Sequence, residues 1–212
     1  MATTERGRPR DPAVDERIVT AALAVYAQHG WAGFSIDAVA RTAGVGKASV
    51  YLRWDSKEDL LTDAVARAFQ PIAAIDTGDV RSDLIALATL LLDIYEGPHG
   101  LAARRMTVES AVTPPIAQRW QHVRRTQVAT ARGIVRRAID RGELPPDTSV
   151  TLVVDTICGA AMLRPVAVPD RLRPRANATR DRYAQQLVDF VLGAAYQQNP
   201  RWSARRRTTV RA

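Results

Sequence analysis

The stretch AGVGKASVY, residues 43–51, decides how the N-terminal part of this 212-residue chain can fold. Gly46 and Lys47 suggest a phosphate-binding loop, G-x-x-x-x-G-K-[S/T], whose backbone N–H groups and lysine surround the phosphates of a nucleotide. The match fails at two fixed positions, because Arg41 replaces the first glycine and Ala48 replaces the final Ser or Thr. We therefore interpret the stretch as a tight turn between two short helices.

The residues around this turn predict helices with clear start and stop signals. Pro12 suits the first turn of a helix that Gly30 ends. Ser35 is a good N-cap for a second helix, and Ser56 begins a sequence that resembles a capping box. Gly44 supplies the positive φ that the turn needs. We expect helices over residues 12–30, 36–43, 47–54 and 56–74.

The helix that follows the turn should turn one face outward. Apolar residues at helical spacing, Ile36, Val39, Val45 and Val50, hold the two short helices together. The remaining side chains mix cations, a hydroxyl, a phenol and small apolar groups, a combination that can enter the major groove of DNA. They are Lys47, Ala48, Ser49, Tyr51, Leu52 and Arg53.

Composition indicates an ordinary soluble protein that is rich in helix. Apolar residues make up 46% of the chain and charged residues 25%, with a net charge of +8. The basic excess lies in the second half, so charge alone does not point to residues 35–57. No signal peptide or apolar run of the ~18 residues that a membrane span needs is visible, and the single Cys158 suits a reducing cytosol. We expect a cytoplasmic protein with no membrane partner.

Helical patterns recur through the rest of the chain, over residues 82–96, 101–111, 115–141, 148–164 and 180–197. A break is expected over the Pro- and Arg-rich residues 165–179. The predicted fold is all-α, with about nine helices and no strand. The predicted domains are a flexible basic arm (1–10), a helix-turn-helix DNA-binding domain (11–57), a larger helical domain (58–198) and a disordered Arg-rich tail (199–212).

Two segments also resemble a known family. SIDAVARTAGVGKASVYLRWDSKEDLL, residues 35–61, resembles the DNA-binding core of TetR-family transcriptional regulators, and RAIDRGELPPDTSVTLVVDTICGAAMLR, residues 137–164, resembles one C-terminal subgroup. The resemblance implies an all-α homodimer with an N-terminal DNA-binding domain and a larger domain for a small effector. It places Ser35 at a phosphate-contacting position, and Lys47, Ser49, Tyr51 and Lys57 at frequent DNA-contact positions. That the larger domain (58–198) serves effector binding and dimerisation is implied only by this family resemblance.

The sequence departs from the family pattern over residues 52–55, where Leu52, Arg53, Trp54 and Asp55 stand. Arg53 could read a guanine, bind a phosphate or remain a solvated surface charge. Tyr51 could be a half-buried core aromatic, and Lys57 could simply extend into water. The operator sequence therefore cannot be carried over from the family.

Two further sets of residues follow from the resemblance. In the family, the last two long helices of each subunit form a four-helix dimer interface, for which the candidates are Leu152, Thr156, Ile157, Ala160, Leu187, Phe190, Val191 and Ala194. These stripes could instead close the core of the monomer. An effector pocket would lie among residues 82–141, with candidates that could equally be core or surface: Tyr95, Met106, Glu109, Trp120 and Gln127.

No catalytic motif or metal-ligand cluster is apparent in the sequence, so we expect neither an enzyme nor a cofactor. The predicted function is that of a sequence-specific, DNA-binding transcriptional regulator. We expect a repressor that leaves a palindromic double-stranded DNA operator when it binds a small, largely apolar ligand. The alternatives are a ligand-independent regulator or an activator of the same architecture, and a helical small-molecule-binding protein that does not use DNA.

Overall fold

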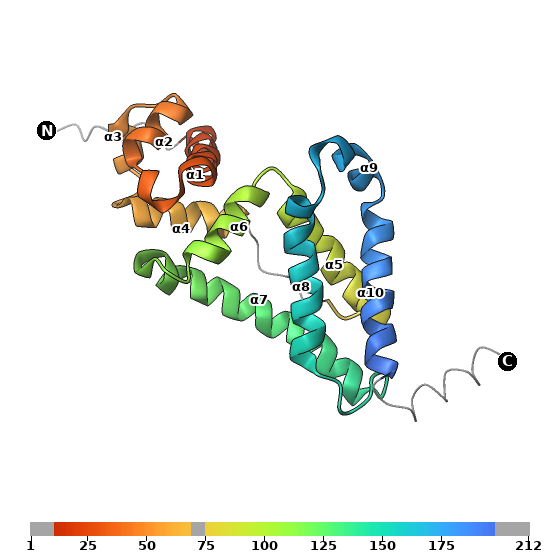
Figure 1. Ribbon diagram of the computed structural model, residues 1–212. Helices are drawn as coiled ribbons and strands as arrows, with labels where there is room; N and C mark the ends of the chain where they lie inside the picture. The colour runs from red at the N-terminus through yellow and green to blue at the C-terminus, as the bar shows by residue number, and fades with distance from the viewer. Residues whose placement is uncertain (1–10, 69–74, 198–212) are drawn as a thin grey trace, which may run out of the picture. The chain divides into compact units, whose positions relative to one another are not determined.

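A computed structural model of the chain describes residues 11–68 and 75–197, without the side chains of residues 115, 116 and 118–124. The described residues form ten α-helices and one 3-10 helix, and no strand occurs among them (Figure 1). The all-α prediction is confirmed. The helices are α1 (Pro12–Gly33), α2 (Ile36–Ala43), α3 (Lys47–Tyr51), α4 (Lys57–Ala68), α5 (Val80–Glu96), α6 (Gly100–Glu109), α7 (Pro114–Asp140), α8 (Val150–Ala167), η1 (Asp170–Leu172), α9 (Arg173–Ala178) and α10 (Arg180–Gln197).

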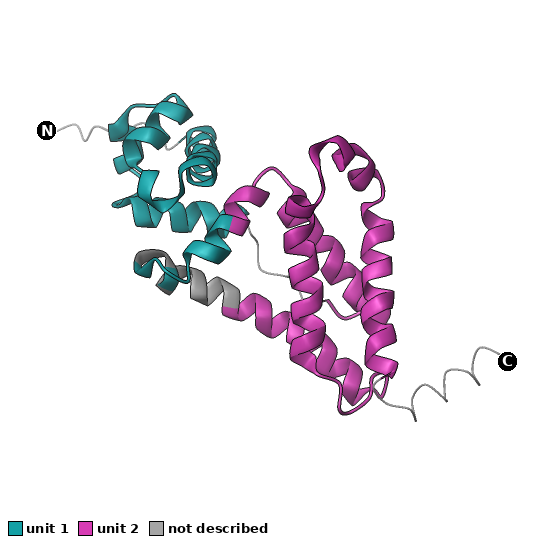
Figure 2. Cartoon of the chain, in the orientation of Figure 1, with its two compact units in different colours: residues 1–69, 105–119 teal, residues 70–104, 120–212 magenta. Residues whose placement is uncertain are grey.

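The chain divides into two compact units, which Figure 2 shows in different colours. The N-terminal unit comprises Met1–Phe69 and Arg105–Arg119, and the C-terminal unit comprises Gln70–Arg104 and Trp120–Ala212. Helix α6 therefore supplies residues to both units. The predicted arm (1–10), the predicted tail (199–212) and the end of the predicted fourth helix (69–74) lie outside the described residues.

The predicted helix signals in the N-terminal unit act as expected. Asp11 caps α1 by accepting a hydrogen bond from the Ala13 N–H at 3.0 Å, directly before Pro12. Gly30 interrupts the helical geometry of α1 with φ 62° and ψ −169°. Ser56 Oγ accepts the N–H of Asp59 at 3.0 Å at the start of α4. Local side-chain chemistry therefore sets these boundaries.

The core of the N-terminal unit forms where α1 packs against α2 and α4. Tyr26 and Phe34 are fully enclosed and meet edge to face, with ring centroids 6.2 Å apart. Val39 from α2, Val50 from α3 and Leu60 from α4 are also fully buried. Each short helix is thus anchored by at least one apolar side chain.

The C-terminal unit has a separate core built from α5, α7, α8 and α10. Fully buried side chains come from each of these helices, including Leu87, Ile134, Ile157 and Val188. Burial of such side chains is the main stabilising contribution in a helical bundle.

The predicted break over residues 165–179 is correct in place, because α8 ends at Ala167 and α10 begins at Arg180, but the stretch is not free of helix. Helix α8 continues through Pro165 to Ala167, and α9 follows within the same stretch. Pro165 lies in the last turn of α8, so the hydrogen bonds that its ring prevents are few. Pro174 occupies the first turn of α9, where the missing N–H has no helical acceptor in any case.

Candidate nucleic-acid interface

The turn between α2 and α3 has the geometry that the sequence predicts. Gly44 adopts the left-handed conformation with φ 66° and ψ 37°. Its N–H donates to the carbonyl of Arg41 at 3.3 Å, and the Val45 N–H donates to the carbonyl of Ala40 at 3.0 Å. A Cβ on Gly44 would meet no atom within 4 Å, so backbone conformation rather than space requires glycine here.

Helix α3 turns one face outward. Tyr51 and Leu52, in the turn that ends the helix, are 49% and 73% exposed, whereas Val50 is 0% exposed and points into the core. Lys47 and Ala48 are exposed and Ser49 is half-buried. We call this set the α3 face; it consists of Lys47, Ala48, Ser49, Tyr51 and Leu52.

Lys47 is held at the edge of the α3 face. Its Nζ lies 2.9 Å from Oδ1 of Asp37 on α2 and 6.0 Å from the centroid of the Tyr51 ring. The hydrogen bond to Asp37 raises the pKa of Lys47. The Lys47 side chain is 51% exposed, so the ion pair with Asp37 leaves it accessible to a partner.

The expectation that Arg53 lies on the outer face is wrong. Its side chain is 12% exposed, its Nε is paired with Asp15 on α1, and its Nη1 donates to the carbonyl of Ser49 at 2.9 Å. The physical reason is that α3 ends at Tyr51, so the next turn brings Arg53 back toward α1. The guanidinium links α1 to α3.

The two predicted contact residues outside the α3 region, Ser35 and Lys57, both make contacts within the N-terminal unit. Ser35 caps α2 by accepting the Ala38 N–H at 3.2 Å. Lys57 Nζ donates to the carbonyl of Phe34 at 3.2 Å and lies 4.0 Å from the centroid of the Trp31 ring. Ser35 therefore stabilises the start of α2, and Lys57 ties the start of α4 to the segment between α1 and α2.

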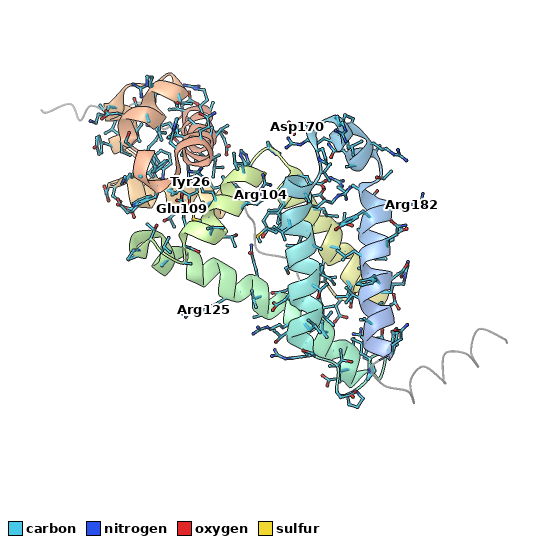
Figure 3. The ribbon with its side chains drawn as sticks, viewed as in Figure 1. Tyr26, Arg104, Glu109, Arg125, Asp170 and Arg182 are labelled. Atoms are coloured by element: carbon cyan, nitrogen blue, oxygen red, sulfur yellow. The ribbon has the colours of Figure 1, made fainter. Side chains whose placement is uncertain are left out.

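A polar contact that sequence reasoning missed completes the N-terminal unit. Glu109 on α6 accepts hydrogen bonds from the buried Tyr26 hydroxyl and the Trp31 N–H, each at 3.0 Å; Figure 3 labels Tyr26 and Glu109. Burial, and next the Glu109 carboxylate, raise the pKa of Tyr26. Arg105 and Glu109 also fill the space beside Gly30, where a Cβ would lie 2.3 Å from the Arg105 guanidinium. No sequence signal links residues so distant in the chain.

The structure does not gather the predicted effector-binding residues into one site. Tyr95 lines a cavity of the C-terminal unit with a volume of about 480 Å³. Met106 is 3% exposed in the N-terminal unit, and the Glu109 carboxylate is occupied by Tyr26 and Trp31. Gln127 on α7 is half-buried. The Trp120 side chain lies outside the described residues.

The predicted dimer residues separate into two groups. Ile157 and Val191 are 0% and 5% exposed and belong to the core of the C-terminal unit, so for these two the alternative, closure of the monomer core, holds. The others form an exposed or half-buried surface with a shallow groove of about 110 Å³, which Leu152 and Phe190 help to line. We call it the α8–α10 face; it consists of Leu152, Thr156, Ala160, Leu187, Phe190 and Ala194.

Helix α8 also has the length and mean hydropathy, 1.5, of a helix that could cross a membrane. A single helix of this kind is a weak indication, because core helices of soluble proteins have the same properties. Its apolar residues already serve the core of the C-terminal unit and the α8–α10 face.

Comparison with known proteins matches both parts of the chain to one family of regulators. The family model described as "Bacterial regulatory proteins, tetR family" matches residues 18–64, and "Tetracyclin repressor-like, C-terminal domain" matches residues 74–191. The HTH-type transcriptional regulator AqdR of Rhodococcus erythropolis is 34% identical over 73% of this chain and 75% of its own length. An HTH-type transcriptional regulator of Mycobacterium bovis is 30% identical over 87% of this chain and 91% of its own.

Solved structures share the fold. The fatty acid degradation regulator FadR from Bacillus halodurans aligns over 88% of this chain and 97% of its own, with a TM-score of 0.66. Its sequence identity of 17% supports a likeness of fold alone.

Proposed function

Since the chain belongs to the TetR family and is a DNA-binding transcriptional regulator, we propose that it acts as a homodimeric cytoplasmic repressor that a small molecule releases from a palindromic operator. The observation that carries this proposal is the α3 face. It follows a left-handed turn at Gly44 and stays outward while Val50 anchors the helix. Such a helix can enter a major groove.

The α3 face supplies two kinds of DNA contact. Lys47 and Tyr51 carry the donors suited to phosphate oxygens, which fix register without reading sequence. Ala48, Ser49 and Leu52 present small apolar and hydroxyl groups to base edges and thymine methyl groups. Ser35 and Lys57 add phosphate contacts, since the Lys57 ammonium has further donors beside the one that Phe34 accepts.

Arg53 has a positioning role in this proposal. Its guanidinium already binds Asp15 and the Ser49 carbonyl and is largely covered. Reading a guanine would require both contacts to break. Arg53 instead fixes the end of α3 against α1, and so the presentation of the α3 face.

Homodimerisation uses the α8–α10 face. Leu152 and Phe190 are 55% and 73% exposed, and exposed apolar side chains grouped in this way mark interaction surfaces. A second copy, related by a two-fold axis, would cover these side chains. The same axis would relate two α3 faces, one for each half-site of a palindromic operator.

Release by a ligand requires a change in the N-terminal unit. Glu109 on α6 bonds Tyr26 and Trp31 of α1, and α6 also supplies residues to the C-terminal unit. A ligand that favours another position of α6 would alter these contacts and the presentation of α3. It must bind the released state more tightly, because equal affinity for both states shifts nothing.

The test is recovery of bound genomic DNA from cells, followed by mobility-shift titration of the recovered site. Wild-type protein should enrich a two-fold symmetric sequence, and Lys47→Ala should weaken its binding about tenfold with a shallower salt dependence. Arg171→Ala, an exposed cation of the C-terminal unit, is the matched control and should bind as wild type. Recovery of no specific sequence would contradict the proposal.

A further inference from the structure

The cavity of about 480 Å³ in the C-terminal unit lies between the turn that joins α5 to α6 and the segment that joins α8 to α9. Its volume falls in the range of small-molecule sites. Its lining combines apolar side chains with two arginines. The residues that matter for its chemistry are Tyr95, Leu101, Arg104, Val168, Arg173 and Asn177.

Arg104 is the half-buried cation that lines this cavity; Figure 3 labels it on α6, and Asp170 on η1. Its Nη1 donates to the carbonyl of Tyr95 at the end of α5. In the part of the chain that the structure describes, no carboxylate forms an ion pair with it. Burial, and next the charge of Arg173, lower the pKa of Arg104. A half-buried guanidinium near a second guanidinium is energetically unfavourable unless an anion lies between them.

The second cation, Arg173, lies at the solvent-exposed edge of the cavity. Its Nη2 is 2.9 Å from Asp170, and the two side chains are 59% and 88% exposed. Exposed pairs of this kind contribute little stability. An anion in the cavity could therefore take the place of Asp170 at low cost. Asn177 adds an amide that can donate to the same anion.

The one acidic residue that lines the cavity is already neutralised. Glu96 Oε1 lies 3.3 Å from Nε of Arg164, and these side chains are 12% and 6% exposed. Arg164 also donates to the Ala176 carbonyl at 2.7 Å and lies 4.1 Å from the centroid of the Tyr183 ring. Arg164 lies outside the cavity lining and neutralises Glu96, so Glu96 does not offset the charge of Arg104.

We infer that this cavity binds a small amphipathic anion, with its carboxylate or phosphate between Arg104 and Arg173 and its apolar part along Leu101 and Val168. Guanidinium groups suit both anions because their donors match planar oxygen pairs. The proposal of an anion-binding site does not depend on DNA binding. The role of that site as the effector site rests on the proposed function.

The test measures binding of three probes to the full chain by isothermal titration calorimetry: octanoate, octyl phosphate and uncharged octanol. At least one anion should bind, and octanol should bind more weakly. Arg104→Gln should weaken the anion about tenfold or more, because one charge-assisted contact is lost. The preferred anion distinguishes a carboxylate ligand from a phosphate ligand.

Two further variants keep the test decisive. Circular dichroism checks that Arg104→Gln, which loses the hydrogen bond to the Tyr95 carbonyl, still folds. Arg173→Gln changes an exposed residue and should also weaken the anion, whereas Arg175→Gln on the same short helix, outside the cavity lining, should not. Equal binding of octanol and the anions, or unchanged anion affinity in both Arg104→Gln and Arg173→Gln, would overturn the inference.

A mobility-shift titration with the bound anion separates this inference from the proposed function. Anion binding together with DNA release supports both. Anion binding without release supports the site and contradicts its effector role. DNA binding without affinity for either anion overturns the site and leaves the regulator intact.

Discussion

The α3 face and the α8–α10 face are both exposed, but they differ in chemistry and in the length of the helices that carry them. The α3 face combines an ammonium, a phenol and small groups on a five-residue helix. The α8–α10 face is largely apolar and lies on two helices of 18 residues each. A polar surface suits the hydrated DNA partner of the proposed function, whereas an apolar surface on long helices suits the proposed second copy of the chain.

The difference also concerns what holds each face in place. Helix α3 is too short to be stable by itself, so its position depends on contacts with other helices. The Arg53–Asp15 pair and Val50 provide them. Helices α8 and α10 are held by the core of the C-terminal unit, through residues such as Ile157 and Val188. A polar contact and one buried side chain position the first face, whereas a core of many buried side chains positions the second.

The largest expected effect comes from charging the α8–α10 face. In the double variant Leu152→Asp, Phe190→Asp, four carboxylates would enter the interface of a dimer, so light scattering should report a monomer. Operator affinity should fall about 100-fold, because a single half-site remains. The fold should survive, since both side chains are more than half exposed, at 55% and 73%.

The matched control for the face is Val112→Asp, which changes a side chain that is 78% exposed in the N-terminal unit. It should leave the oligomeric state unchanged. A double variant that remained dimeric would show that the copies associate elsewhere.

An intermediate effect is expected from the Arg53–Asp15 pair. Arg53→Ala and Asp15→Asn should each weaken operator binding about tenfold without changing base preference, and the double variant should lose little more. The reason is that both changes release the same contact between α1 and α3. Mobility-shift titration against operators with single base changes measures both quantities.

Arg67→Ala removes another ion pair of the N-terminal unit, to Asp63 within α4 at 2.9 Å, and should bind DNA almost as wild type. If Arg53→Ala relaxed the preference at one base while Asp15→Asn behaved as wild type, Arg53 would be a base-reading residue after all.

The smallest effect concerns Tyr26, whose hydroxyl ties α1 to α6. Tyr26→Phe should reduce the free energy of unfolding by about 1 kcal/mol at neutral pH, because one hydrogen bond is lost. The raised pKa means that the folded state keeps its proton above the ordinary value of 10.0, so stability falls as pH rises beyond that value. Urea unfolding near pH 8 and near pH 11 should show that the free energy of unfolding falls less in Tyr26→Phe than in the wild type. An identical fall in both proteins would contradict this origin.

Local signals were sufficient for much of the N-terminal unit. Ser35, Gly44 and Ser56 act on backbone groups within a few residues, so their roles could be predicted from neighbouring residues. Arg53 shows the limit of such reasoning. Its partner Asp15 lies on another helix, and the end of α3 at Tyr51 decides which way the guanidinium turns.

The same limit applies to the C-terminal unit. Periodicity identified the apolar stripes of α8 and α10, but it could not separate Ile157 and Val191 from Leu152 and Phe190. That division depends on where α5 packs. The cavity around Arg104 was also beyond prediction, because its walls come from two segments that only the folded chain brings together.

The sequence by itself determined the helical fold, the turn at Gly44, the caps and the family, because each depends on residue spacing along one segment. Only the tertiary structure decided that Glu109 would complete the N-terminal unit, that Arg53 would join α1 to α3, and that Arg104 would face a cavity. These outcomes depend on distances between helices, and such distances follow from the packing of many side chains at once.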